Sequence, residues 1–405
     1  MPSALPDGDP APPTGELSAA ALAGFEARQF GIYVHVPFCA TRCGYCDFNT
    51  YTATELGGGA SAASYADTAI AEVRLARHVL GLRRPVDTVF FGGGTPTLLP
   101  AADLTRVLAA VDREFGLSPD VEVTTEANPE SVTPESLAAL RAGGFTRISF
   151  GMQSAAPHVL ATLDRQHTPG RAAAAVSEAR AAGFDRISLD LIYGTPGESD
   201  EDWRRSLTAA IETGVDHVSA YSLIVEPGTR LAARVARGEI PMPEDDVLAD
   251  RYLIAEALLT QAGFGWYEVS NWASGEADRA RHNLLYWTGG DSWGVGPGAH
   301  SHVGGVRWWN VKHPREYAAR LSAGVSPAAA RETLTPAERR AEDILLRIRL
   351  QEGLPLDVLH PSGLVAAARA RDDGLLEAAA HAAGRAVLTL RGRLLADAVV
   401  RDLVD

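Results

Sequence analysis

The sequence predicts an α/β protein whose larger part is a partial (β/α)6 barrel and whose smaller C-terminal part is mostly helical and winged-helix-like. Three observations predict this fold. Short β-rich segments alternate with helical patterns, which is typical of parallel strands joined by right-handed crossovers. The strand segments are apolar over most of their length, as expected when helices cover a parallel sheet. The β-rich segment occurs six times, short of the eight strands that close a barrel.

The elements of the barrel follow one another at regular intervals. The β-rich segments are GIYVHV from Gly31, VDTVFFGG from Val86, VEVTTEA from Val121, TRISFGMQ from Thr146, DRISLDLIYG from Asp185 and DHVSAYSLIV from Asp216. Helical patterns follow the first five, at Ser64–Leu80, Ala101–Phe115, Pro134–Ala142, Arg171–Ala182 and Asp200–Thr213. A glycine stands at the expected end of each helix, at Gly81, Gly116, Gly143, Gly183 and Gly214.

Further helices are expected after the barrel. An acidic helix is expected over 244–262, and a Thr-Pro start at Thr335 opens the last portion, which continues with helical segments at 364–383 and 388–404. The sequence predicts four parts. They are a disordered N-terminal tail (1–25), a partial barrel (26–240), a barrel-covering segment that contains HNLLYW (241–325) and a C-terminal helical, winged-helix-like domain (326–405).

Composition limits the partners of the chain and its location. The 405 residues, 46% of them hydrophobic, suffice for one large domain and a small one. The formal charge of −14 argues against nucleic acid or an anionic membrane as the main partner. No apolar run approaches the ~18 residues of a membrane span. The start MPSALPDGDPAPPTGEL lacks the features of an export signal, so we expect a cytoplasmic protein with reduced cysteines.

All the cysteines of the chain lie in the run CATRCGYC, where Cys39, Cys43 and Cys46 form a CxxxCxxC pattern. Three thiolates on one loop suit a cubane iron–sulfur cluster with one iron open to another ligand, since the usual cluster and structural zinc take four protein ligands. Spacing alone leaves two alternatives open: a zinc site completed by His35, and a redox or inert role. The close spacing argues against a disulfide.

The segment GIYVHVPFCATRCGYCDFNTY resembles the cluster loop of radical S-adenosylmethionine (SAM) proteins, and more narrowly that of the oxygen-independent coproporphyrinogen III oxidase group. The resemblance runs from about Gly31 to the C-terminus. It implies a [4Fe–4S] cluster on the three cysteines, with SAM chelating the fourth iron, and an adenosyl site lined by Tyr33 and Tyr45. It also implies one-electron reduction of the cluster and cleavage of SAM to methionine and a 5′-deoxyadenosyl radical, chemistry that the cofactors supply.

Other candidate residues stand where the predicted strands end, at the rim where ligands of parallel α/β folds gather. The GGGTP turn alone is a weak signal, since such turns occur in any fold. The resemblance assigns SAM contacts to Gly93, Gly94, Thr95, Glu126, Gln153, Arg165, Asp190 and Ile224. Arg165 is expected to pair with the SAM carboxylate and Asp190 with the ribose hydroxyls.

The segment from Arg281 to Asn310 is rich in tryptophan, glycine and histidine. Its start, HNLLYW, fits the HNxxYW pattern of the haem chaperone branch of this group. The haem candidates are His282, Tyr286, Trp287, His300 and His302, with His282 expected first as axial ligand and His300 or His302 next. The residue types alone favour the alternative, in which the tryptophans only pack the open side of the barrel and the histidines hydrogen-bond to backbone.

The resemblance therefore implies a chaperone that binds haem and passes it to an acceptor protein, with a reductant for the cluster. The alternative is an oxygen-independent coproporphyrinogen III oxidase, and a weaker one is a radical SAM enzyme with another substrate. Phe48 stands where the oxidases carry an additional cysteine, and only 32 residues precede Tyr33, whereas the oxidases carry a longer N-terminal segment. Whether SAM is cleaved productively, and whether the protein is a monomer or a cofactor-dependent dimer, stays open.

Overall fold

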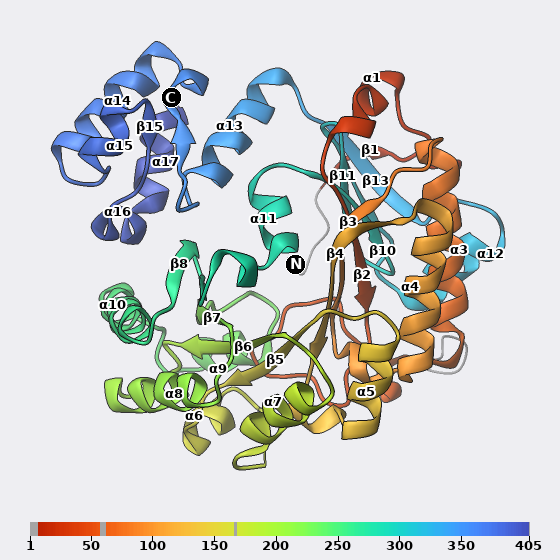
Figure 1. The fold of residues 1–405 in the computed structure, drawn as a ribbon, viewed down its shortest axis with the longest axis horizontal. Coiled ribbons are helices and arrows are strands. Elements are labelled where there is room, and N and C mark those ends of the chain that lie inside the picture. The colour runs from red at the N-terminus through yellow and green to blue at the C-terminus, as the bar shows by residue number, and fades with distance from the viewer. Residues whose placement is uncertain (1–6, 57–61, 166–167, 405) are drawn as a thin grey trace.

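The computed structural model describes residues 7–56, 62–165 and 168–404. One sheet of thirteen strands dominates it, in the order β1-β13-β12-β11-β10-β2-β3-β4-β5-β6-β7-β9-β8. Strands β2 to β7 pair in parallel and curve into an open barrel, with helices on the outer side (Figure 1). This confirms the predicted α/β fold with an incomplete barrel.

The six predicted strands and five predicted helices are all present. The strands are β2 (Phe30–Val36), β3 (Val86–Gly93), β4 (Leu117–Ala127), β5 (Arg147–Gln153), β6 (Arg186–Tyr193) and β7 (His217–Ser222). The helices are α3 (Ala62–Leu80), α4 (Ala101–Phe115), α5 (Pro134–Ala142), α7 (Arg171–Ala181) and α8 (Asp200–Glu212). Short helices α2 (Ala53–Leu56), α6 (Pro157–Thr162) and α9 (Arg230–Ala236) follow β2, β5 and β7.

The two faces of the barrel strands differ more than the sequence predicts. Val89 and Phe91 of β3 are fully buried in the main hydrophobic core, whereas Thr88 of the same strand hydrogen-bonds to His282 inside the barrel. Deep in the interior, Arg147 of β5 pairs with Glu122 of β4 at 3.1 Å, and both side chains are almost completely buried. The strands therefore alternate, with an apolar outer face and a polar inner face.

The segment predicted to cover the barrel instead extends its sheet at both edges. Strands β8 (Gly265–Glu268) and β9 (Asn271–Ala273) continue the sheet beyond β7. Helix α10 (Asp245–Gln261) contacts β8. Strand β10 (Asp291–Val295) pairs in parallel with β2, and β11 (His300–Val303), β12 (Val306–Asn310) and β13 (Ala328–Thr333) follow antiparallel. Only α11 (Arg281–Trp287) lies on the concave side of the sheet (Figure 1), while α12 (Pro314–Ser322) packs on α3.

The prediction of a disordered tail over 1–25 is wrong for residues 7–25, and residues 1–6 lie outside the described residues. Strand β1 (Asp9–Pro10) pairs with β13, and Pro13 accepts a hydrogen bond from the Ser326 amide at 2.7 Å. A short helix α1 (Ala19–Leu22) follows, and Phe25 is fully buried. Proline is tolerated on an edge strand, so a composition typical of disorder is compatible with pairing at the free edge of β13.

The last seventy residues or so have a core of their own. It is built from α13 (Pro336–Arg347), α14 (Pro361–Asp372), α15 (Ala378–Ala382), α16 (Leu390–Leu394), α17 (Ala396–Val404) and the short pair β14 (Leu354–Pro355) and β15 (Arg385–Ala386). Thr335 caps α13 in a capping box, as its sequence predicts. The single helical segment expected over 364–383 is broken, because Gly374 takes a left-handed backbone with φ of 71°. No helix in the described ranges is long and apolar enough to cross a membrane.

Candidate functional site

A cavity of about 1560 Å³ opens at the C-terminal ends of the barrel strands, larger than an ordinary small-molecule site. The predicted residues that line it are Cys39, Cys43, Cys46, Tyr45, Gly93, Gly94, Thr95, Glu126, Gln153, Arg165, Asp190 and Ile224. They come from six strand ends and the loops that follow, so the rim expected from the sequence is one continuous site. Tyr33 and the haem candidates do not line this cavity.

The cysteine loop is fixed by the GGGTP turn beneath it. The amide of Gly94 donates to the Val36 carbonyl at 2.8 Å, and the amide of Thr95 donates to the Phe38 carbonyl at 2.7 Å. A Cβ atom on Gly94 would lie 2.4 Å from that carbonyl oxygen. Gly94 therefore has to be a glycine, because any side chain there would clash with the carbonyl of Phe38, the residue directly before Cys39. This turn positions the first cysteine, whichever ligand the cavity takes.

The three thiols are partly exposed and form no disulfide. Burial raises the pKa of Cys39, and it raises the pKa of Cys46 to about 11, so both are protonated near neutral pH. Across the described part of the chain, no three His, Cys, Asp or Glu side chains gather closely enough to hold one metal ion. A cubane does not need such a gathering, because each thiolate binds a different iron.

Two carboxyl groups form the inner wall of the cavity. Glu126 accepts a hydrogen bond from the Gly93 amide at 3.0 Å, and Asp190 accepts one from the Ser149 hydroxyl at 3.0 Å. Burial, together with the nearby Asp190, raises the pKa of Glu126 to about 8, and burial also raises the pKa of Asp190. A cationic ligand would favour the ionised form of both groups.

Arg165 reaches from the end of α6 to the cysteine loop. Its Nη1 donates to Cys43 Sγ at 3.4 Å, and its Nη2 donates to the Gly151 carbonyl at 3.2 Å. Gln153, with φ of 59°, and Asp164, with φ of 53°, both have left-handed backbones, which non-glycine residues rarely adopt. Strained residues of this kind cluster at ligand sites, where the surrounding structure holds them in place.

Three of the predicted SAM residues lie at different depths. Tyr45 packs on a small apolar cluster formed by α6, the end of β6 and the segment after β7. Ile224 is 63% exposed and lies beyond the last residue of β7, Ser222. Tyr33 lies inside the barrel, where its hydroxyl is 2.9 Å from His35 Nδ1 and its ring stacks on Phe90.

The HNLLYW segment forms α11, and its polar groups are bound by the barrel. The ring of His282 is hydrogen-bonded through Nδ1 to Thr88 at 2.8 Å and through Nε2 to Tyr286 at 3.0 Å. Burial lowers the pKa of His282 to about 3, so the ring is neutral. Asn283 and Trp287 hydrogen-bond to the buried Glu268 of β8. Both nitrogens of His282 are thus engaged, which disfavours it as the first choice of axial ligand.

His302 and His300 stand on β11 and differ in their partners. His302 is hydrogen-bonded through Nδ1 to the Gly290 carbonyl at 3.3 Å, and its Nε2 accepts from the Gly305 amide at 3.1 Å. His300 is partly buried and stacks on Trp309 with 5.9 Å between ring centroids. Among the residues that the structure describes, no hydrogen bond engages its ring nitrogens, and burial lowers its pKa to about 4.

Among the cavity residues that the sequence reasoning missed are Ser149 and Tyr221. Ser149 lies on β5 two positions before Gly151, so the period of a strand places both on one face. That alternation was the available signal. Tyr221 carries no comparable signal, although 42% of its surface is accessible inside the cavity.

Comparisons with known proteins agree with this geometry. The model of the Radical SAM superfamily matches residues 33–210. The heme chaperone HemW of Mycobacterium tuberculosis is 55% identical over 95% of this chain and 97% of its own length. The HemW of Bacillus subtilis is 32% identical over 91% of this chain and 97% of its own. The chain belongs to the HemW family of the radical SAM superfamily.

The HemW family shares its fold with a related enzyme. The structure of coproporphyrinogen III oxidase (HemN) from Escherichia coli, a radical SAM enzyme, covers 95% of this chain and 91% of its own, with a TM-score of 0.79 and 24% identity. At that identity the likeness shows the fold alone. Membership of the superfamily implies a [4Fe–4S] cluster and SAM as cofactors. Three thiols on one loop, beside a large cavity with an acidic wall and with Arg165 next to Cys43, fit this pair.

Proposed function

We propose that the protein is a haem chaperone, which binds haem and passes it to an acceptor protein. The observation that carries the proposal is the 55% identity with the HemW of Mycobacterium tuberculosis over nearly the whole of both chains. That similarity extends through the rim cavity, α11 and the C-terminal helical domain, and is not limited to the cofactor-binding barrel.

The rim cavity is the proposed cofactor site. Cys39, Cys43 and Cys46 would hold the [4Fe–4S] cluster, and the lining residues Tyr45, Gly93, Gly94, Thr95, Glu126, Gln153, Arg165, Asp190 and Ile224 would hold SAM. A reduced cluster with bound SAM supplies one-electron chemistry. The residues of this chain bind and orient: Arg165 offers two-pronged contact with a carboxylate, and the ionised Glu126 and Asp190 offer countercharges to a cation.

For haem, we propose a site on the concave side of the sheet with His300 as the axial ligand. A neutral imidazole with an available nitrogen is what iron requires, and His300 meets both conditions. Trp309 provides a flat apolar partner beside it. Lys312 lies near enough for its charge to act on His300, so a cation is at hand for an anionic propionate. Tyr286, 41% exposed on the same side, would contact the macrocycle.

The remaining partners follow from this role. The proposal includes a cytoplasmic location, a haem-accepting protein and a reductant for the cluster, with a monomer or a cofactor-dependent dimer as the acting form. Porphyrinogen oxidation is the competing function. Phe48, which stands where the oxidases carry a further cysteine, is 46% exposed at the cavity and offers no thiol.

Two parallel assays on anaerobically purified, cluster-reconstituted protein test the proposal. Haem titration followed by the Soret band is expected to saturate at about one haem per chain, and incubation with coproporphyrinogen III and SAM is expected to give no protoporphyrinogen. SAM-dependent formation of protoporphyrinogen would overturn the chaperone in favour of the oxidase. Haem binding that fails to saturate would contradict a defined site.

A further inference from the structure

A small helix beside the cofactor cavity carries none of the residues proposed above to hold a cofactor, although its first residue, Arg230, lines the cavity. Helix α9 (Arg230–Ala236) follows β7 and begins at the N-cap Thr229, whose side chain accepts from the Ala232 amide. Its Leu231 is 1% exposed and packs in the small apolar cluster beside Val159 and Leu163 of the α6 region. This cluster is separate from the main core of the barrel.

Backbone hydrogen bonds connect α9 through the cysteine loop to α6. The amide of Leu231 donates to the Gly44 carbonyl at 2.8 Å, and the amide of Gly44 donates to the Leu163 carbonyl at 3.0 Å. Gly44 lies between Cys43 and Cys46, and a Cβ atom on it would lie 2.5 Å from Asp164 Oδ2. Both backbone polar groups of this glycine are therefore used to join two helices across the cluster loop.

Two arginine side chains of α9 add three further connections. Nη1 of Arg234 donates to the Thr162 carbonyl at 3.0 Å, at the C-terminal end of α6. Arg230 donates to the Arg42 carbonyl in the cysteine loop and pairs with Asp164 at 3.6 Å. Carbonyls at a helix end lack partners within the helix, and a charged donor satisfies them strongly.

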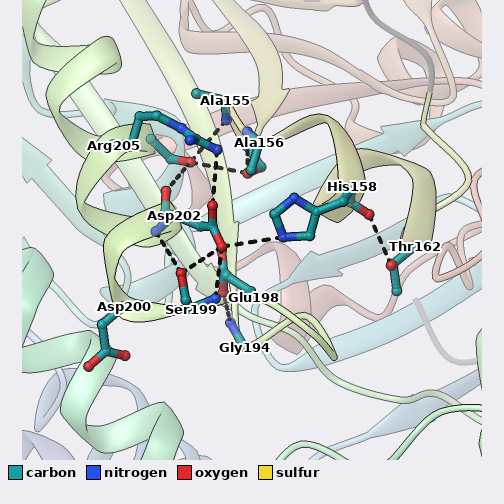
Figure 2. A network of polar contacts seen from close by, with 12 residues as sticks. Ala155, Ala156, His158, Thr162, Gly194, Glu198, Ser199, Asp200, Asp202 and Arg205 are labelled. Carbon is teal, nitrogen blue, oxygen red and sulfur yellow. Dashed lines mark hydrogen bonds and ion pairs between the residues drawn. The ribbon is translucent and has the colours of Figure 1, made fainter.

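The start of α6 is held by α8, and Figure 2 shows the contact between His158 and Asp202. His158 Nε2 lies 3.3 Å from Asp202 Oδ2, and the Ala155 amide donates to the Ser206 hydroxyl at 2.9 Å. Helix α6 is thus held near its N-terminal end by α8 and at its C-terminal end by α9. The residue that follows it is Asp164, with its left-handed backbone, and then Arg165, whose guanidinium contacts Cys43.

We propose that Arg234 is a positioning residue, which acts through the end of α6 to hold Arg165 against the cysteine loop and so tunes the binding of SAM. The inference rests on the proposed cofactor site. Without the Arg234 contact, the turn at Asp164 can relax, and Arg165 loses its fixed distance from the cluster. The three cysteines are not touched by this change, so cluster assembly continues.

The test compares Arg234→Ala with Arg237→Ala in the cluster-loaded protein. Arg237 is the matched control, because it lies at the same helix end and, among the described residues, its side chain is bound to Glu239, at 2.5 Å, the acid that Arg234 also approaches at 3.7 Å. We expect Arg234→Ala to weaken SAM binding about tenfold, as loss of an outer-shell partner commonly does. We also expect a reduced SAM-dependent change in the EPR spectrum of the reduced cluster, with unchanged iron content. Arg237→Ala should match the wild type.

A conservative variant separates positioning from folding. Arg234→Lys keeps a charged donor for the Thr162 carbonyl and should restore most of the SAM affinity. Hydrogen exchange provides a readout independent of SAM: amides at 42–46 and 160–165 should exchange faster in Arg234→Ala than in Arg237→Ala. Equal affinity, EPR spectra and exchange in the two alanine variants would overturn the positioning role. A wild type that binds no SAM would contradict the cofactor site itself, and with it this inference.

Discussion

The rim of the barrel and helix α11 both carry sequence motifs of the same family, but the motif residues of the rim face a cavity, whereas those of α11 are hydrogen-bonded within the chain. At the rim, twelve predicted residues line one cavity, and the three cysteines form no disulfide and are partly exposed to it. In α11, the ring nitrogens of His282 and the side chains of Asn283 and Trp287 are all hydrogen-bonded to the chain itself. A motif points to a ligand site only where its polar groups remain available.

The contrast changes the interpretation of HNLLYW. Helix α11 connects β3, β4 and β8 through Thr88, Glu122 and Glu268, so its motif holds the open side of the barrel together. The available histidine lies nearby in sequence but on another element, His300 of β11. Substitutions that separate a ligand role from a structural role can break or sharpen this comparison.

The largest effect is expected at the rim. Cys43→Ser removes one of three thiolates, and no other cysteine exists to replace it. We expect near-complete loss of the broad cluster absorption and of iron and sulfide after anaerobic reconstitution, with haem binding retained. Iron analysis and absorption spectra check this. A cluster that survives in Cys43→Ser would remove the basis for the three-cysteine site.

Within α11, His282→Ala should damage stability and leave haem binding intact. The substitution leaves the buried hydroxyl of Thr88 without its partner and opens a cavity, which should lower the free energy of unfolding by about 2–4 kcal/mol. His300→Ala should do the reverse, with weaker haem binding and a change in stability of about 1 kcal/mol or less. Urea unfolding gives the free energy of unfolding of each variant, and Soret titration gives its affinity for haem. The opposite assignment would restore His282 as the ligand.

The GGGTP turn provides a smaller effect. Gly94→Ala places a Cβ atom 2.4 Å from the Phe38 carbonyl oxygen, so the cysteine loop must shift. We expect a loss of about 1–3 kcal/mol and lower cluster occupancy. Gly265→Ala is the control, because its nearest neighbour would be 3.9 Å away. If Gly94→Ala loads a full cluster with wild-type stability, the turn does not position the loop.

The smallest effect concerns pH. Because burial and Asp190 raise the pKa of Glu126 to about 8, the folded state holds a proton that the unfolded state releases near pH 4.5. Its stabilising contribution is complete below the unfolded pKa and is lost as the pH rises through about 8. Between pH 6 and pH 7.5 the difference amounts to at most about 2 kcal/mol. Glu126→Gln should flatten the decline in unfolding free energy over that range, and identical slopes for the two proteins would contradict the shifted pKa.

Local patterns predicted the strands and helices of the barrel well, but they did not predict the strands that extend its sheet at the edges. The five helices and six strands follow from apolar periodicity and glycine stops, and α8 ends one residue before the predicted Thr213. The pairing of β10 with β2 and of β1 with β13 joins segments hundreds of residues apart, which no local period encodes. The prediction of disorder over residues 7–25 was wrong because it relied on composition, which does not show that a sheet edge elsewhere in the chain is open for pairing.

In the candidate site, too, some features could be predicted from local sequence patterns and others could not. Strand ends predicted which residues share the rim, since parallel strands place their C-terminal ends together. The engagement of His282 could not be predicted, because its partner Thr88 lies 194 positions away on another strand. The role of α9 was equally hidden, since Arg234 acts through a backbone carbonyl and carries no motif.

Mössbauer spectroscopy of protein reconstituted anaerobically with ⁵⁷Fe tests most directly whether three cysteines hold a cluster with one open iron. The expected spectrum is that of a [4Fe–4S] cluster in which one iron site changes its isomer shift when SAM is added. A spectrum of mononuclear iron, or a cluster whose four irons are all indifferent to SAM, would contradict it.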